Sequence, residues 1–235
     1  MNMANNKIGV IYCSTGPCPY FSKQASYSLY ADRSAGSLKK FLPDIDITLF
    51  SDTLEHPPLK NISKIKLLPD FPRKGAFFSK IRSLQNSPYE KTLYLDSDTM
   101  ILDNRVELIF DMLEKFDILG IHGPVRVSNI VPPKYSHIPL AFPEVNGGVI
   151  AFKNNERTQQ VWDKWFDLYY EDMVKKEAGN DQLSLRCVLW ETNLRLGILP
   201  DEYNHRAKNP VVNEKFPNKN TVIHHSRAGY PEIKA

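Results

Sequence analysis

The sequence has little that would place it in a membrane, in an oxidising compartment or on nucleic acid. No apolar stretch approaches the roughly 20 residues that span a bilayer, and residues 1–6 contain no apolar core of a secretory signal. Only three cysteines occur, Cys13, Cys18 and Cys187, without the spacing of a metal site. We therefore expect a cytoplasmic chain with free thiols. A disulfide between Cys13 and Cys18 is the alternative.

Net charge and composition exclude further classes. The net charge of +3 is too small for a general nucleic-acid binder, although a local basic pocket for phosphates is compatible with it. Hydrophobic residues make up 42% and charged residues 24% of the chain, which argues against disorder. A length of 235 residues suits one α/β domain with a sizeable core. We expect a single domain over residues 1–235, with 1–6 as a flexible tail.

Strand-like and helix-like stretches alternate along the chain. Short apolar runs predict buried strands at residues 7–13, 46–50, 62–68, 91–95, 117–121, 145–152, 196–200 and 221–224. Apolar residues at helical spacing predict helices over residues 20–40, 73–84, 106–116, 158–170 and 181–190. This alternation indicates an α/β fold with a mostly parallel central sheet flanked by helices. The proline-rich region 122–143 has little periodicity, which is typical of a functional lid or binding loop.

Two aspartates follow directly after the strand predicted at 91–95. Asp96 and Asp98 occupy alternate positions, and in extended backbone such side chains point the same way. We expect both carboxylates to face one point at the strand's carboxyl end, where open α/β sheets bind ligands. A divalent cation would relieve their repulsion and leave coordination positions for substrate phosphates. The alternative is a solvated turn, because Asp and Ser are common in turns.

The last predicted strand ends in histidine. The segment Thr221-Val222-Ile223-His224 is followed directly by His225. Imidazole is a good ligand for Mn²⁺-like ions, so two Asp and one His form a plausible mixed set. Because side chains alternate along a strand, only one of the two histidines can point at such an ion. A surface pair near a flexible end is the alternative.

Glycine and lysine supply two further signals. Asn146, Gly147 and Gly148 lie within a strand pattern, where glycine often marks the close approach of a ligand or of another backbone. A bulge is the alternative. Lys80 precedes the acid-bearing strand and could meet phosphate oxygens, whereas a solvated helix face is its ordinary interpretation.

Asp181 and Gln182 open the helix predicted at 181–190. A carboxylate and an amide offer the directional hydrogen bonds that a polyol such as a sugar needs. A simple helix N-cap at Asp181 is the alternative.

In this order the patterns resemble glycosyltransferase family eight, the glycogenin-like and lipopolysaccharide-galactosyltransferase-like enzymes of the GT-A fold. Six elements match in sequence: the lysine-bearing helix at 79–81, the Asp-x-Asp strand and the apolar strand after it at 93–102, the Asn-x-Gly-Val strand at 145–152, the Asp-Gln pair at 180–182, the Leu-Pro…Tyr-Asn step at 199–204, and the histidine strand at 222–224. One departure follows that histidine. The family often continues with Gly and Lys-Pro-Trp, whereas this chain reads His-Ser-Arg-Ala-Gly-Tyr-Pro at 225–231, with Arg227 in place of the lysine.

The resemblance implies a role for each matching residue. Asp96, Asp98 and His224 would hold Mn²⁺ or Mg²⁺ against the diphosphate of a nucleotide sugar. The other residues implied at the donor are Lys80 and Arg227 at the phosphates, Ser97 near the ribose, Tyr12, Ser14 and Thr15 along the base, and Asn146, Gly147, Asp181 and Gln182 around the sugar.

The expected function is metal-dependent transfer of a sugar from a nucleotide sugar to a hydroxyl acceptor such as a carbohydrate. UDP as the nucleotide and retention of configuration follow from the resemblance alone, and Asp181 is the first candidate near the anomeric carbon. Two alternatives stay open. One is a carbohydrate- or nucleotide-binding domain of this fold without turnover. The other is a sugar-nucleotide pyrophosphorylase, although residues 14–19 hold one glycine and no basic residue, unlike the glycine-rich basic loop of such enzymes.

Overall fold

The structure of the protein is a computed structural model that describes residues 7–15, 27–68, 76–123, 131–175, 181–206 and 220–226. The tail expected at 1–6, the first parts of the helices predicted at 20–40 and 73–84, and Arg227 lie outside the described residues.

Strands and helices alternate within these ranges much as predicted. The strands are β1 (Ile8–Ser14), β2 (Asp46–Ser51), β3 (Lys64–Leu67), β4 (Lys91–Leu95), β5 (Thr99–Ile101), β6 (Ile118–His122), β7 (Val145–Lys153), β8 (Leu196–Ile198), β9 (His205–Arg206) and β10 (Ile223–His225). The helices are α1 (Tyr27–Lys39), α2 (Ala76–Gln85), α3 (Leu108–Met112), α4 (Glu156–Lys175) and α5 (Gln182–Glu191), with short 3-10 turns η1 (Asn104–Glu107), η2 (Pro133–Tyr135) and η3 (Asp201–Asn204). The helix predicted at 106–116 is η1 followed by α3, and β9 was not predicted.

A seven-stranded sheet in the order β3-β2-β1-β4-β7-β6-β8 forms the centre of the molecule. Its neighbouring strands pair in parallel, except that β7 runs antiparallel to both β4 and β6. The predicted mostly parallel sheet is therefore confirmed. Strands β1, β2, β4 and β7 are buried along nearly their whole length, which explains why they read as continuous apolar runs.

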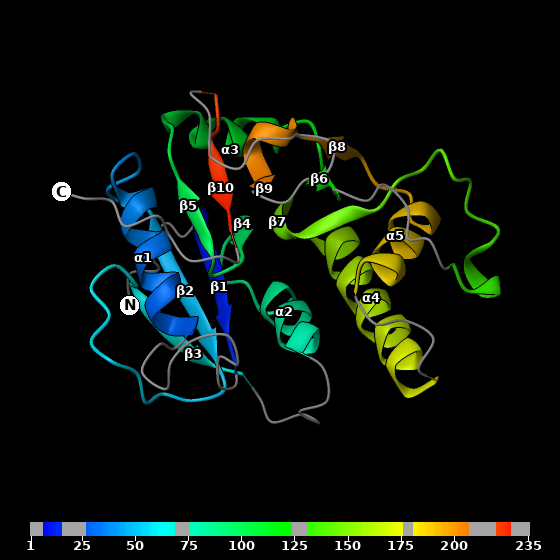
Figure 1. The fold of residues 1–235 in the computed structure, drawn as a ribbon, viewed down its shortest axis with the longest axis horizontal. Helices are drawn as coiled ribbons and strands as arrows, with labels where there is room; N and C mark the ends of the chain where they lie inside the picture. Colours follow the sequence, from blue (N-terminus) through cyan, green and yellow to red (C-terminus); the bar gives the residue numbers. More distant parts are fainter. Residues whose placement is uncertain are drawn as a thin grey trace.

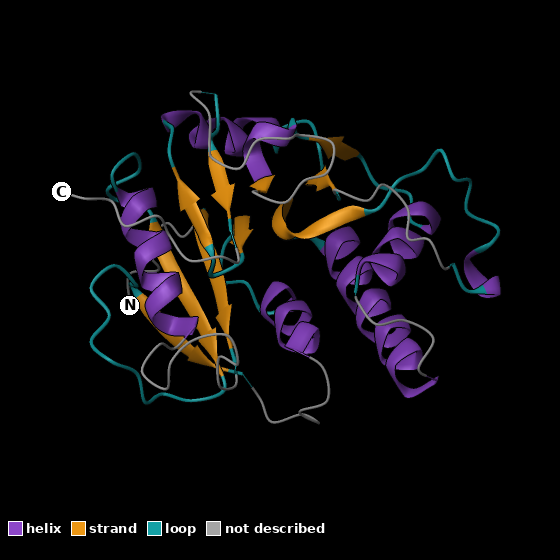
Figure 2. Cartoon of the chain, in the orientation of Figure 1, coloured by secondary structure: helices purple, strands orange, loops and turns teal. Residues whose placement is uncertain are grey.

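Helices cover both faces of this sheet and make three layers. Figure 1 shows α1 on one side and α2, α4 and α5 on the other, and Figure 2 shows the strands between them. Alternation along β1 sends Val10 and Tyr12 to the core under α1 and α3, whereas Ile11 joins the core under α2, α4 and α5. None of the helices in the described part of the chain is long and apolar enough to cross a membrane.

Segments that are distant in sequence meet at the edge of the sheet that is formed by the carboxyl ends of β1 and β4. Since β1 and β4 are parallel, their carboxyl ends meet at this edge, and the antiparallel β7 reaches it with its first residues. Beyond β4 the chain turns into β5, which pairs antiparallel with β10, and β10 pairs parallel with β9. Residues 96–98, 145–148, 205–206 and 223–225 therefore lie around the end of β4.

Candidate active site

Asp96, Asp98 and His225 converge at this edge. The Nε2 atom of His225 lies 3.1 Å from Asp98 Oδ1 and 3.7 Å from Asp96 Oδ2. One donor atom from each residue lies within 4.8 Å of the others. The two aspartate side chains are 27% and 31% exposed, whereas that of His225 is only 4% exposed. The cluster therefore has a buried imidazole on one side and an open side towards solvent.

The backbone that carries the aspartates is a turn. Ser97 and Asp98 are turn residues, and the backbone N–H of Thr99 donates to the Asp96 carbonyl oxygen at 3.2 Å. The Thr99 hydroxyl donates to the same oxygen at 2.9 Å. The expectation that extended backbone aligns the two carboxylates was therefore wrong, although the carboxylates do converge. The turn predicted as the alternative is the structure that brings them together.

His225, and not His224, joins the aspartates, so the prediction of His224 in that place was wrong. In β10, His225 lies opposite Thr99 and His224 opposite Met100, and alternation sends the two rings to opposite faces. His224 Nδ1 lies 3.1 Å from His205 Nδ1 instead. Burial, together with the neighbouring His205 and His225, lowers the pKa of His224 to about 4. His224 is therefore a neutral, buried ring at neutral pH.

A chain of hydrogen bonds fixes the orientation of the His225 ring. The backbone N–H of Gly148 can only donate, and it donates to Asn146 Oδ1 at 2.9 Å. Asn204 Nδ2 donates to the same oxygen at 3.0 Å, which turns Asn204 Oδ1 towards His225. His225 Nδ1 lies 2.8 Å from that Oδ1 and must carry the proton, because an amide oxygen only accepts. Nε2 of a neutral His225 therefore directs its lone pair at the carboxylates.

This arrangement fits a cation. A lone pair held 3.1 Å from a carboxylate oxygen is repelled unless a proton or a metal ion lies between them. Carboxylate and imidazole ligands suit ions such as Mn²⁺, and metal-binding histidines are typically held through the other ring nitrogen, as His225 is. Burial acts to raise the pKa of Asp98, but interactions led by the hydrogen bond with His225 lower that pKa overall. Asp98 is therefore held as the carboxylate that a cation ligand requires.

The glycines at the start of β7 leave room for the cluster. A Cβ atom on Gly148 would lie 2.4 Å from His225 Cε1 and 2.9 Å from Asp96 Oδ2. A Cβ atom on Gly147 would lie 3.0 Å from Lys80 Nζ and 3.3 Å from Asp181 Oδ2. The expected close approach is therefore made by the protein's own side chains. The pairing of β7 with β6 also shifts register over these residues, so the alternative of a bulge holds as well.

Lys80 and Asp181 form a buried ion pair beside the cluster. Lys80 Nζ lies 3.3 Å from Asp181 Oδ2 and 3.7 Å from Asp96 Oδ1. Burial acts to lower the pKa of Lys80, but Asp181 and Asp96 together raise it. Burial raises the pKa of Asp181 despite the attraction of Lys80. Asp181 occupies the N-cap position of α5 but makes no capping hydrogen bond with its side chain, so its carboxylate serves the ion pair.

The end of β1 lies next to the aspartate turn. Ser97 Oγ donates to the carbonyl oxygen of Cys13 at 3.2 Å, and this contact places the turn beside Ser14 and Thr15. Gln182 is the first residue of α5 and is half-buried next to Asp181. Ser97, Ser14 and Thr15 are therefore linked through one hydrogen bond, Gln182 is the chain neighbour of Asp181, and the contact of these residues with a donor stays a prediction.

Tyr12 does not reach the cluster. Its side chain is fully buried in the core under α1, and its hydroxyl lies 2.9 Å from Ser34 Oγ. The predicted contact of the Tyr12 side chain with a nucleotide base is therefore corrected, because alternation along β1 turns this ring to the face covered by α1, where it is buried.

Sequence reasoning assigned no role to two residues that orient the cluster. The Tyr94 hydroxyl donates to Asp96 Oδ1 at 2.7 Å, and Asn204 holds His225. Tyr94 had a usable signal, since it lies in β4, two residues before Asp96. Asn204 had none beyond its place in a matching motif, because its contact with His225 depends on the pairing of β9 with β10.

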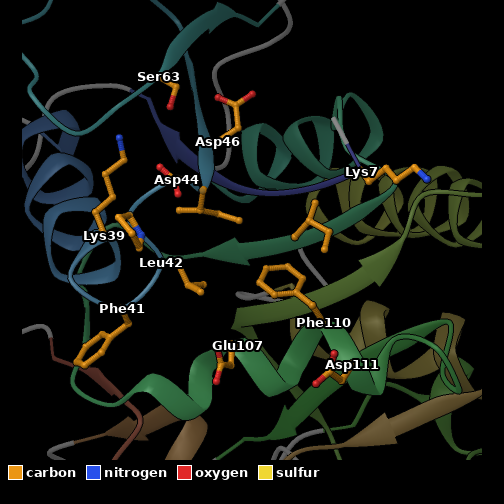
Figure 3. A pocket seen from close by; sticks show the side chains of 13 residues that line it. Lys7, Lys39, Phe41, Leu42, Asp44, Asp46, Ser63, Glu107, Phe110 and Asp111 are labelled. Atoms are coloured by element: carbon orange, nitrogen blue, oxygen red, sulfur yellow. The ribbon is translucent and has the colours of Figure 1, made fainter. Parts of the chain in front are cut away.

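An open hollow of about 790 Å³ lies at the other end of the strands, beside the amino ends of β1 and β2 (Figure 3). Lys7 and Asp46, at the amino ends of β1 and β2, line it, and the Phe110 ring from α3 faces it. It contains no residue of the Asp96 cluster. The volume of this hollow is therefore no guide to the position of the chemistry.

Comparison with solved structures finds proteins of the same fold. An active-site mutant of LgtC matches with a TM-score of 0.61 and 13% identity, over 97% of this chain and 91% of that chain. The galactosyltransferase LgtC in complex with donor and acceptor sugar analogues gives a TM-score of 0.60 and 13% identity, over 93% and 87%. The glycosyltransferase GlyE of Streptococcus pneumoniae TIGR4 gives 0.62 and 16%, over 93% of this chain and 55% of GlyE.

No protein-family model and no curated protein sequence matches the chain. At identities of 13% and 16% the structural likeness shows the fold, and it confirms the predicted GT-A fold.

Proposed function

We propose that the chain is a glycosyltransferase that uses a divalent cation, Mn²⁺ or Mg²⁺, and a nucleoside-diphosphate sugar, with UDP as the favoured nucleotide. The acceptor would be a hydroxyl group of a carbohydrate. The observation that carries the proposal is the convergence of Asp96 and Asp98 on His225 Nε2, with the ring held by a chain of hydrogen bonds anchored on backbone. The fold shared with LgtC and GlyE supports the reaction class.

Some residues of the proposed cation site would bind the ion, and others orient its ligands. Asp96, Asp98 and His225 would hold the ion, which supplies positive charge to stabilise the leaving nucleoside diphosphate. Tyr94 and Asn204 keep Asp96 and His225 oriented through their hydrogen bonds. The exposed side of the carboxylates leaves space for phosphate oxygens.

Lys80 and Asp181 link the phosphate side of the site to the sugar side. The Lys80 ammonium lies next to Asp96 and is positioned by Asp181, so we assign it to the donor phosphates. Asp181 and Gln182, at the start of α5, are assigned to the sugar. We propose retention of configuration by analogy with the resembling family, and no nucleophile is assigned.

The remaining donor contacts are assigned to the end of β1 and the aspartate turn. Ser97 is assigned to the ribose, and Ser14 and Thr15 to the base, since the hydrogen bond from Ser97 to Cys13 joins these segments. Arg227 is assigned to the phosphates on the resemblance alone. Asn146 Oδ1 already accepts two hydrogen bonds within the protein, and one of them positions Asn204. We therefore assign the contact with the sugar to the other atoms of Asn146.

Incubation with a panel of nucleotide sugars, with and without Mn²⁺, tests this proposal. Mn²⁺-dependent release of nucleoside diphosphate, with the sugar on an added saccharide, is the expected result, and Asp98→Asn is the matched inactive control. Exchange of pyrophosphate into the nucleotide sugar would identify a pyrophosphorylase instead. Saturable binding of a nucleotide sugar without any turnover would identify a binding domain.

A further inference from the structure

A second group of metal-binding side chains lies away from the Asp96 cluster. His137 follows η2, and Cys187 and Glu191 lie one turn apart on α5. Glu191 Oε1 lies 3.1 Å from His137 Nε2 and 3.4 Å from Cys187 Sγ. One donor atom from each residue lies within 4.8 Å of the others. Cys187 is 4% exposed, whereas the side chains of His137 and Glu191 are 47% and 50% exposed, so solvent ions can reach the group.

The distances between the donor atoms suit a tetrahedral ion. Bonds of about 2.0 Å to nitrogen and oxygen and about 2.3 Å to sulfur place neighbouring ligand atoms roughly 3.3–3.5 Å apart. The observed separations of 3.1 Å between His137 Nε2 and Glu191 Oε1 and 3.4 Å between Cys187 Sγ and Glu191 Oε1 are close to these values. These two pairs would therefore need little movement to bind an ion, and the third pair, His137 and Cys187, has donor atoms within 4.8 Å of each other.

The His137 ring is held in the orientation that a metal ligand requires. Its Nδ1 lies 2.9 Å from the carbonyl oxygen of Lys134. A carbonyl only accepts, so Nδ1 carries the proton and the lone pair of a neutral ring lies on Nε2, which faces Glu191. That lone pair and a carboxylate oxygen repel at 3.1 Å unless a proton or a cation lies between them. A backbone hydrogen bond to the second ring nitrogen is the usual support of a metal-binding histidine.

We propose that His137, Cys187 and Glu191 bind a Zn²⁺ ion, with water in the fourth position. Thiolate and imidazole ligands favour Zn²⁺, whereas Mn²⁺ and Mg²⁺ prefer oxygen-rich sites such as the Asp96 cluster, which has no sulfur. Binding replaces the thiol proton of Cys187, which passes to solvent.

The ion would fasten the segment before β7 to α5. Arg186 on the same helix already donates to the carbonyl oxygens of Phe142 and Pro139 in that segment. Cys187 also packs against Tyr135 and Ile138. Figures 1 and 2 show this segment beyond α5, on the side away from the sheet. At 1.5 Å per residue, Glu191 lies about 14 Å along the helix from Gln182, so this site is separate from the proposed active site and does not rest on it.

Cobalt titration of the chelator-treated full chain tests the proposal. Co²⁺ replaces Zn²⁺ in such sites, and a sulfur-to-cobalt charge-transfer band reports thiolate coordination, to which the Asp96 cluster cannot contribute. We expect this band to saturate within two equivalents of Co²⁺, because the Asp96 cluster can take up the other ion without contributing to the band, and to disappear when Zn²⁺ is added. Cys187→Ser should abolish it, and His137→Gln and Glu191→Gln should each weaken Zn²⁺ binding at least about tenfold. Cys18→Ser and His56→Ala are matched controls and should retain both the band and the affinity.

Two kinds of result overturn the proposal. The first concerns the band, which would either be absent from the unaltered chain or survive in Cys187→Ser. Because Cys187 is buried, its replacement could disturb the fold, so Glu191→Gln supplies an independent test at a half-exposed position. The metal-free melting midpoint of Glu191→Gln should equal that of the unaltered chain. An equal Zn²⁺ affinity in these two proteins is the second contradicting result. Neither measurement requires sugar transfer, so failure here is distinguishable from failure of the proposed function.

Discussion

Asn204 Oδ1 accepts a hydrogen bond from His225 Nδ1 at 2.8 Å, and this contact sets which ring nitrogen faces Asp96 and Asp98. The Asn204→Ala variant leaves the ring free to turn. Loss of such an outer contact should weaken Mn²⁺ binding about 10- to 100-fold, as measured by calorimetric titration.

Asn61→Ala is the matched control for Asn204→Ala. Asn61 makes its hydrogen bonds to Asp32, which is not part of the cluster. It should lower stability and leave Mn²⁺ affinity unchanged. Equal Mn²⁺ affinities in Asn204→Ala and the unaltered chain would show that the hydrogen-bond chain does not support an ion.

The two adjacent histidines provide a paired test. His225→Ala removes a donor atom from the cluster and should weaken Mn²⁺ binding at least about 100-fold, since ligands matter more than their supports. His224→Ala removes a ring that faces His205, so Mn²⁺ affinity should stay within about threefold, while stability falls by roughly 1–3 kcal/mol. Titration and thermal melting measure both quantities. The reverse pattern would restore His224 as the ligand and refute the geometry.

Gly148 should not tolerate a side chain. A Cβ atom there would lie 2.4 Å from His225 Cε1, so Gly148→Ala must displace the ring or β7 and should abolish Mn²⁺ binding. Gly36→Ala is the comparison, because its Cβ would meet only the end of the flexible Asn61 side chain at 3.0 Å. Alanine favours a helix interior by up to about 1 kcal/mol, so Gly36→Ala should retain binding and stability. Wild-type affinity in Gly148→Ala would contradict this account.

The Lys80 ion pair should show a distinctive pH dependence. Lys80→Met leaves the Asp181 carboxylate buried without its partner, which should cost about 3–5 kcal/mol of unfolding free energy at pH 7 without metal. The pKa of Asp181 in the folded state is raised above the ordinary 3.8, so the folded state favours the protonated carboxyl. Stability is therefore lost as the pH rises through this raised pKa. Removal of Lys80 raises that pKa further. The loss of unfolding free energy in Lys80→Met should therefore become smaller as the pH falls from 7 towards 3.8, as measured by urea unfolding.

Two further variants complete the Lys80 test. Asp181→Asn combined with Lys80→Met should recover most of the lost stability, because no unpaired charge is left. Lys64→Met removes an exposed pair with Asp46 and should cost no more than about 1 kcal/mol. A deficit that stays constant with pH in Lys80→Met would show that Asp181 is not its cause.

Much of the fold was readable from local pattern. Buried strands such as β1 and β4 require nearly continuous apolar runs, and these runs are visible in the sequence. The aspartates, Lys80 and Asp181 were found because charged residues next to buried elements are conspicuous. Their proximity to one another could be expected because the carboxyl ends of parallel strands lie side by side, where open α/β sheets bind ligands.

The direction in which individual side chains point could not be predicted from the local sequence. Choosing between His224 and His225 requires the register of β10 against β5, which lies more than 100 residues earlier in the chain. A strand buried on both faces gives no sign of which face Tyr12 takes. Cys187 showed no metal-site spacing because His137, its neighbour in space, lies 50 residues away in sequence.

The central claim is a divalent cation held by Asp96, Asp98 and His225 against the diphosphate of a donor. A crystal grown with Mn²⁺ and UDP, with diffraction recorded at the manganese absorption edge, locates the ion directly. The account predicts an anomalous difference peak within bonding distance of both carboxylates and of His225 Nε2, with the diphosphate on its open side. A manganese peak elsewhere, or UDP bound without any peak among these three side chains, would contradict it.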